Sequence, residues 1–80
     1  MELGEVLREF GLNSKESEIY LALLKSGPST VAEISKKISI LRQSIYDILD
    51  KMVSKGIIGQ SVSNNTKVFH AVEAKVLFQI

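Results

Sequence analysis

Hydrophobic residues recur at helical spacing through the first two thirds of the chain. Within residues 2–10 they fall three and four positions apart, which predicts a short amphipathic helix. Asn13 followed by Glu16 predicts the capping box of a second helix, which Gly27 and Pro28 end. The apolar face of this second helix is formed by Ile19, Tyr20, Leu21, Leu23 and Leu24.

Two further helices are predicted in close succession. Thr30 and Glu33 form another capping-box pattern, at the start of a short helix over residues 31–38. Residues 39–41 then make a tight connection to a longer helix over residues 42–55. This longer helix is expected to bury one face, which carries Ile45, Ile48, Leu49, Met52 and Val53.

After Gly56 the pattern changes from helix to strand. Residues 57–62 and 67–72 are rich in β-branched and apolar side chains, and Asn64-Asn65 between them suits a hairpin turn because asparagine tolerates positive φ. Helical spacing returns beyond the hairpin. We therefore expect residues 73–80 to be the start of a C-terminal helix, one that either mediates dimerisation or is truncated at residue 80, with the apolar residues Ala74, Val76, Leu77 and Ile80.

These elements together predict a fold. An isolated two-stranded hairpin is marginally stable in water, so it needs a helical layer to pack on. The very short connection between helices 31–38 and 42–55 forces a steep crossing, which is the helix-turn-helix arrangement. We predict an α+β winged helix-turn-helix domain over residues 1–72, with three to four helices and a two-stranded β-hairpin wing.

Composition limits the function classes. The 80 residues suffice for one small domain, and with 45% hydrophobic but only 6% aromatic residues its core is mostly aliphatic. The absence of cysteine excludes a disulfide framework and a thiolate metal site. No apolar run approaches the ~20 residues of a membrane helix, so we predict a cytoplasmic protein with no membrane contact. His70 is the one histidine, and the sequence has neither a phosphate-binding glycine loop nor metal-ligand spacing. We therefore expect that the protein is not an enzyme and that it binds no cofactor or metal.

Charge is distributed unevenly, although the net charge is only +1. Residues 1–34 carry six glutamates against three basic residues, a balance of −3. Residues 35–72 carry six basic residues against two aspartates, a balance of +4. The basic second half favours contact with a polyanion, and two ordinary solvated surfaces are the alternative interpretation.

The amino end of helix 42–55 is the strongest candidate for reading DNA bases. At 100° per residue, the side of this helix opposite Ile45 points away from the core, and Gln43 lies on it. In helix-turn-helix proteins the first residues of the second helix reach base edges in the major groove. Gln43 could pair with adenine, Arg42 with guanine or a phosphate, and Ser44 with either.

Other candidates would contact the sugar-phosphate backbone. Tyr46 is a candidate because its hydroxyl could reach a phosphate. The alternative interpretation is that Tyr46 lies half-buried against a neighbouring strand. Lys51 lies nearer the DNA backbone. Ser29 and Thr30, which we interpret first as caps, stand where the short helix offers free backbone N–H groups to another phosphate.

The tip of the wing carries a third group. Lys67, Asn64 and Asn65 could reach the adjacent minor groove or its phosphates, although the two asparagines are turn residues first. Asp47 and Asp50, also on the outward face of helix 42–55, repel phosphate. Together with the weak net charge, they motivate an alternative function, a winged-helix protein–protein interaction module in a transcription or chromosome-organising complex.

The run from Leu12 to Val72 resembles the amino-terminal domain of archaeal TrmB-type transcriptional regulators. The resemblance is carried by FGLNSKESEIYLALLKSGPSTVAEISKKISILRQSIYDILDKMVSKGII and by VFHAV. Positions that match the family pattern are Gly11, Leu12, Glu16, Tyr20, Leu23, Leu24, Gly27, Pro28, Thr30, Glu33, Ile34, Arg42, Tyr46, Leu49, Lys55, Gly56, Phe69, Ala71 and Val72. Leu41 departs from the pattern, because the family often has proline there.

This resemblance implies a DNA-binding transcriptional regulator, or its DNA-binding domain, that acts on double-stranded DNA as a homodimer. Members of the family usually continue into a dimerising coiled coil and a sugar-binding effector domain. These 80 residues contain no such domain, so we expect no small-molecule effector site in this chain.

Overall fold

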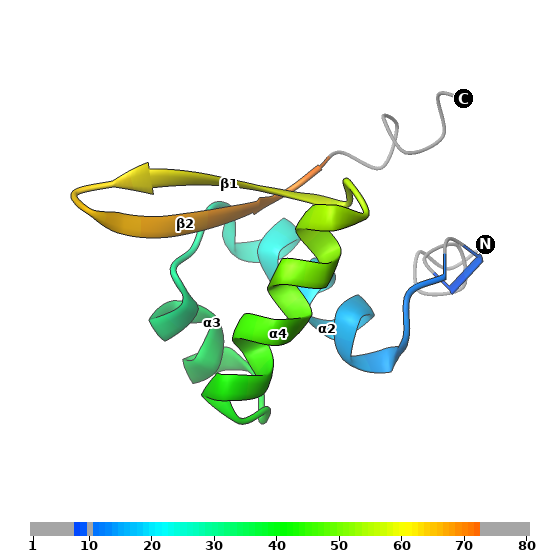
Figure 1. Cartoon of the computed structure of the whole chain (residues 1–80). Helices are drawn as coiled ribbons and strands as arrows, with labels where there is room; N and C mark the ends of the chain where they lie inside the picture. The colour runs from blue at the N-terminus through cyan, green and yellow to red at the C-terminus, as the bar shows by residue number, and fades with distance from the viewer. Residues whose placement is uncertain (1–7, 10, 73–80) are drawn as a thin grey trace.

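The computed structural model describes residues 8, 9 and 11–72, and their elements follow the predicted order (Figure 1). Arg8 and Glu9 are helical. The rest of the helix expected over 2–10, and the helix expected over 73–80, lie outside the described residues. The described elements are α2 (Ser14–Ser26), α3 (Val31–Lys37), α4 (Arg42–Ser54), β1 (Ile58–Ser63) and β2 (Thr66–Ala71).

The capping box predicted for α2 is confirmed. The backbone N–H of Glu16 donates to Asn13 Oδ1 at 2.9 Å, and the N–H of Asn13 donates to Glu16 Oε1 at 3.0 Å. These two bonds satisfy N–H groups that have no partner within a helix. At the other end, Gly27 adopts a φ of 77°, which glycine tolerates, and its N–H donates to the Leu23 carbonyl.

Strands β1 and β2 form an antiparallel hairpin, here called the wing, which projects to one side of the helices (Figure 1). Pairing runs from Ile58 opposite Ala71 to Ser63 opposite Thr66, so the loop has two residues. Asn64 and Asn65 both have positive φ, 51° and 62°, as a turn matching the strand twist requires. The predicted hairpin is therefore confirmed, with β1 beginning and ending one residue later than expected and β2 one residue earlier.

The base of the wing is tied to the helical layer at two places. Ser29, in the connection between α2 and α3, exchanges both backbone hydrogen bonds with Phe69, at 2.9 and 2.8 Å. At the end of β2, the Tyr20 hydroxyl donates to the Val72 carbonyl, and burial raises the pKa of this tyrosine above its ordinary value. The wing is therefore held in one orientation relative to α2 and α3.

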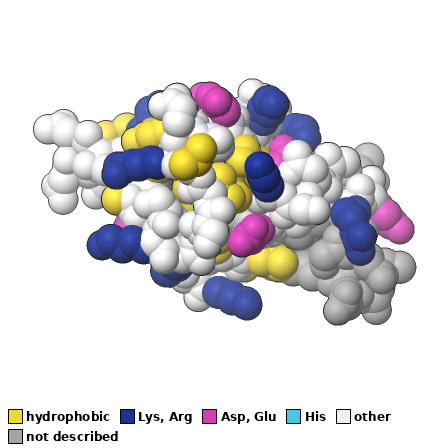
Figure 2. All heavy atoms as spheres, turned by 90° about the horizontal axis from the view of Figure 1, so that it is seen from below, with side chains coloured by type: hydrophobic (Ala, Val, Ile, Leu, Met, Phe, Trp, Pro, Cys, Tyr) yellow, Lys and Arg dark blue, Asp and Glu magenta, His cyan; other side chains and the backbone are white. Residues whose placement is uncertain are grey.

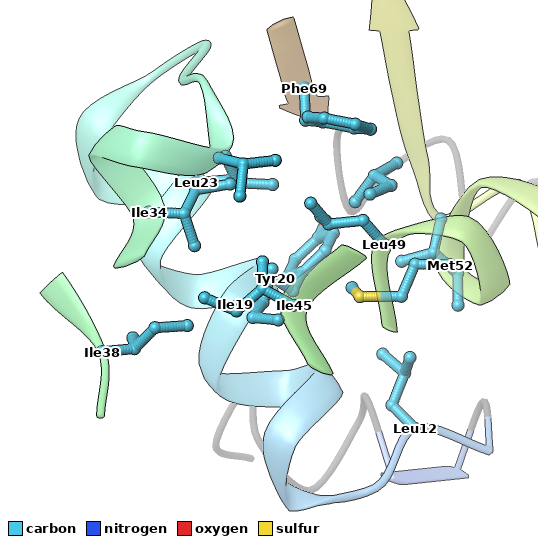
Figure 3. Packing of buried hydrophobic residues seen from close by; sticks show 13 residues of the cluster. Leu12, Ile19, Tyr20, Leu23, Ile34, Ile38, Ile45, Leu49, Met52 and Phe69 are labelled. Atoms are coloured by element: carbon cyan, nitrogen blue, oxygen red, sulfur yellow. The ribbon is translucent and has the colours of Figure 1, made fainter. Parts of the chain in front are cut away.

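The core lies between the three helices and the inner face of the wing (Figure 3). Helix α4 supplies its centre, because Ile45, Leu49 and Met52 are fully buried. Ile48 and Val53 flank that stripe on the helix and are only half-buried, and Leu24 on α2 is exposed, contrary to the sequence prediction. The buried cluster comprises Leu12, Ile19, Tyr20, Leu23, Val31, Ile34, Ile38, Ile45, Leu49, Met52, Ile57, Ile58 and Phe69.

An ion pair connects the start of α2 to the end of α4. Lys55 Nζ lies 3.2 Å from Glu16 Oε2 and 3.4 Å from the Gly11 carbonyl oxygen. The Glu16 side chain is buried, and it accepts both this ammonium and the Asn13 N–H. This contact holds the carboxyl end of α4 against the start of α2. At the other end of α4, Arg42 and Gln43 are exposed. Within the described residues, no helix is long and apolar enough to cross a bilayer.

Candidate nucleic-acid interface

A groove of about 310 Å³ opens where the start of α3, the first turns of α4 and the wing meet. We call it the wing groove. Four of the residues predicted to contact DNA line it, from three separate elements: Thr30, Arg42, Tyr46 and Lys67. Its remaining lining residues are Val31, Ala32 and Thr66.

Helix and hairpin geometry explain why these side chains converge. Arg42 and Tyr46 are four residues apart, so they lie on the same face of α4. The two-residue turn sets Lys67 opposite Val62, near the tip of the wing. The pairing of Ser29 with Phe69 brings the start of α3 beside the wing and completes the groove.

Thr30 lies in the wing groove as the N-cap of α3. Its Oγ1 accepts from the Glu33 N–H at 3.2 Å, and the Glu33 carboxylate accepts from the Thr30 N–H at 3.0 Å. These bonds confirm the second predicted capping box. The hydrogen bond from the Thr30 backbone holds the pKa of Glu33 below its ordinary value, with smaller contributions from the Thr30 hydroxyl and from Lys37. A negative charge therefore stands at this end of α3 and opposes phosphate binding there.

We expect Glu33→Gln to make the domain less sensitive to acid. A carboxyl group whose pKa is lowered by folding stabilises the folded state above its unfolded pKa, and this stabilisation is lost as the pH falls through the folded pKa. Glutamine can still accept from the Thr30 N–H but does not titrate. Urea unfolding between about pH 6 and pH 3 should show a smaller loss of stability in the variant than in the wild type. Equal losses would contradict a charge-dependent cap.

Ser29 does not contribute to this surface. Its side chain is buried and its hydroxyl donates to the Gly27 carbonyl at 3.0 Å, while its backbone pairs with Phe69. The predicted phosphate contact of Ser29 is therefore not available in this structure. Its role is to join the wing to the helices.

The other predicted contact residues lie outside the wing groove. Gln43 is exposed on the first turn of α4, next to Arg42, and Ser44 is half-buried. Lys51 is exposed, but it follows Arg42 by about two and a half turns and so points to the opposite side of α4. Asn64 and Asn65 are exposed at the tip of the wing. His70 is a strand residue, and its imidazole lies against Gly59 on the neighbouring strand.

Sequence reasoning missed part of this region. Val31, Ala32 and Thr66 line the wing groove, yet their residue types carry no nucleic-acid signal. The turn at Asn64-Asn65 already implied the position of Thr66, because a two-residue loop sets it opposite Ser63. Leu41, placed by the sequence in the α3–α4 connection and noted there for standing where the family often has proline, is highly exposed immediately before Arg42.

Figure 2 shows the side on which the chain passes from α3 to α4. Lys and Arg side chains surround a central group of hydrophobic side chains on this face, with acidic side chains among them. The exposed residues of α4 include Arg42 and Lys51 as well as Asp47 and Asp50. The positive charge on this helix is therefore strongest at its amino end, where the wing groove opens.

A helix-turn-helix followed by a hairpin wing defines the chain as a winged-helix domain. Residues 7–75 match the family described as "Sugar-specific transcriptional regulator TrmB", and the chain belongs to this family. The resemblance noted in the sequence is thereby confirmed. The TrmB family is one of transcriptional regulators, so the coarse class of the protein follows from its sequence and fold together.

Individual relatives agree with this assignment. The chain is 32% identical over 78 residues to the HTH-type sugar sensing transcriptional regulator TrmBL1 of Pyrococcus furiosus, covering 98% of this chain and 23% of that protein. It is 33% identical over 75 residues to the protein YrhO of Bacillus subtilis, covering 94% of this chain and 27% of YrhO. The chain thus spans about a quarter of the length of these relatives.

Among solved structures, the oxidised form of MarR from Escherichia coli superposes with a TM-score of 0.73 at 13% identity. The superposition covers 96% of this chain and 68% of the MarR chain. At this level of identity the likeness concerns the fold, and it confirms the predicted winged-helix architecture.

Proposed function

We propose that this domain binds double-stranded DNA as part of a transcriptional regulator, with α4 in the major groove and the wing against the neighbouring backbone. The observation that carries the proposal is the wing groove, which gathers two cations from different elements, Arg42 on α4 and Lys67 on the wing. Such a groove at the amino end of the second helix of a helix-turn-helix matches the docking geometry of this motif on a duplex.

Each residue has a distinct role in this proposal. Arg42 and Gln43, exposed on the first turn of α4, hydrogen-bond to base edges. Tyr46 and Thr30, which both line the wing groove, contact the DNA backbone through their hydroxyl groups, Thr30 against the repulsion of the nearby Glu33 carboxylate. Lys67 adds a charge contact from the wing, and Asn64 and Asn65 approach the adjacent minor groove. Ser44 and Lys51 lie on the other side of α4, toward the second DNA strand.

A homodimer is the proposed functional unit. Two copies would set two α4 helices about one turn of DNA apart, and the operator would then contain two related half-sites. We also propose a cytoplasmic location for the regulator, and no effector site within these 80 residues.

Salt dependence tests the proposal. Each phosphate contact releases counterions, so the logarithm of the association constant should fall linearly with the logarithm of salt concentration between about 50 and 200 mM. Lys67→Ala should lower this slope by about 0.9, because it removes one contact. Lys25→Ala, which removes the same charge from α2 outside the wing groove, is the matched control and should leave the slope unchanged. A binding constant that does not vary with salt would contradict the proposal.

The exposed Asp47 and Asp50 favour a second candidate, a protein-interaction surface on α4. Both carboxylates lie on the outward side of the helix, where they would repel phosphate and attract a basic partner. Under this alternative, no binding to duplex DNA would be measured even at low salt, and a partner protein would bind α4 instead.

A further inference from the structure

Leu41 occupies the N-cap position of α4, directly before Arg42. Its carbonyl accepts from the Ile45 N–H at 3.0 Å and so begins the helix. This role belongs to the backbone and does not depend on the leucine side chain. The side chain itself makes no capping hydrogen bond and is 80% exposed to solvent.

Leucine is a poor residue for this position. Helices α2 and α3 both begin with complete capping boxes, at Asn13 and Thr30, whereas α4 has no side-chain cap. Serine, threonine, asparagine or aspartate would stabilise the start of the helix, and an exposed leucine leaves apolar area in water. Neither the local structure nor the core therefore accounts for Leu41. Departures from such local preferences are expected chiefly at functional sites.

Exposed hydrophobic side chains are also concentrated around the proposed DNA surface. In the described part of the chain, the large hydrophobic side chains that are exposed are those of Leu24, Leu41, Tyr46 and Val62. Tyr46 lines the wing groove, and Val62 lies opposite Lys67 near the tip of the wing. Leu24, on α2, is the exception. A single exposed leucine is ordinary, but Leu41 adjoins the residues that we propose to read bases.

We propose that Leu41 packs against the C5-methyl group of a thymine in the major groove, and so selects an A·T pair at the edge of the sequence read by α4. Among the four standard bases only thymine presents a methyl group there, and apolar side chains are its usual contact. The inference rests on the proposed DNA-binding function. The neighbouring Arg42 makes DNA a better fit than an apolar protein surface, because its positive charge draws a duplex toward Leu41.

The test begins with the whole chain and a pool of duplexes containing a randomised segment. Duplexes enriched by the wild type should share a thymine at a fixed position, and deoxyuridine placed there removes only the methyl group. We expect wild-type affinity to fall about fourfold on this replacement, the effect of losing one buried methyl contact.

Two variants assign that effect to Leu41. Leu41→Ser should bind the thymine duplex about fourfold more weakly than the wild type does. The variant should bind the deoxyuridine duplex with the same affinity as the thymine duplex, because it has no leucine side chain to contact the methyl group. Serine can cap α4, so the same variant should unfold at a temperature about 5 °C higher than the wild type, which separates lost binding from lost folding. Leu24→Ala is the matched control, because it removes another exposed leucine side chain, on α2 and away from the proposed DNA surface. This variant should keep the fourfold preference for thymine.

Three results would overturn the inference. If Leu41→Ser retains the full preference for thymine, another group contacts the methyl. If it instead changes the mass of the protein in solution without changing that preference, Leu41 belongs to a contact between copies of the chain. If no duplex is enriched by the wild type, both this inference and the proposed function fail, whereas DNA binding without a Leu41-dependent methyl effect refutes the inference alone.

Discussion

Leu49→Ala is expected to lower the free energy of unfolding by about 2–5 kcal/mol, the usual cost of truncating a buried leucine to alanine. Leu49 is fully buried at the centre of α4, so the variant loses transfer free energy and leaves a cavity among close-packed neighbours. A domain of this size has a total stability of about 4–12 kcal/mol. The midpoint of thermal unfolding should therefore fall by at least about 10 °C, measured by circular dichroism.

The control for this prediction lies one residue away. Ile48 is on the edge of the buried stripe and is only half-buried, so Ile48→Ala should cost about 1 kcal/mol. Unfolding curves for both variants would test which face of α4 packs on the core. Equal losses, or a Leu49 loss below that of Ile48, would mean that α4 is rotated from the orientation on which the DNA proposal depends.

Arg42→Ala should weaken binding to a selected duplex about 5- to 150-fold, the effect of losing one arginine–guanine contact of about 1–3 kcal/mol. Binding to random DNA should fall much less, because most of that affinity comes from the remaining phosphate contacts. The fold itself should be unaffected. Arg42 is exposed, and a positive charge at the amino end of a helix is not stabilising.

Arg42→Lys separates the two roles that the sequence left open for this side chain. Lysine keeps the charge but cannot form the bidentate pair with guanine. If Arg42 reads a base, the lysine variant should lose most of the specificity while keeping its affinity for random DNA, as measured by competition between the two duplexes. Full recovery of specific binding by lysine would show that Arg42 serves as a phosphate contact.

Features set by a few neighbouring residues could be predicted from the sequence. The capping boxes at Asn13 and Thr30 need only two residues three positions apart, and the hairpin turn needs only Asn64-Asn65. The clear separation of apolar and polar positions on α4 also predicted its buried face. These local signals, with the short α3–α4 connection, were sufficient to give the winged-helix fold.

Features that depend on tertiary contact could not be predicted in this way. From the sequence, Ser29 was interpreted as a helix cap or a phosphate contact. In the structure it pairs with Phe69, forty residues later in the chain, and is buried. The same pairing creates the wing groove, so the contribution of Val31 and Ala32 has no local signature. The exposure of Leu41 could not be predicted from the spacing of hydrophobic residues either. A residue in a connection can face inward or outward without changing the pattern of hydrophobic and polar positions.

The Ser29–Phe69 bridge also determines which part of the wing is anchored to the helices and which part is not. Near Phe69, strand β2 has hydrogen-bonded neighbours on both edges, β1 on one side and Ser29 on the other. Toward Asn64 and Asn65, the bridge no longer contributes, and the strands rely on each other. The wing is therefore anchored to the helical layer at its base, whereas its tip is held only by the pairing of its two strands. In the proposed complex with DNA, the end of the wing would therefore be the part that adjusts to a groove whose width varies with sequence, while its base stays fixed to the helices.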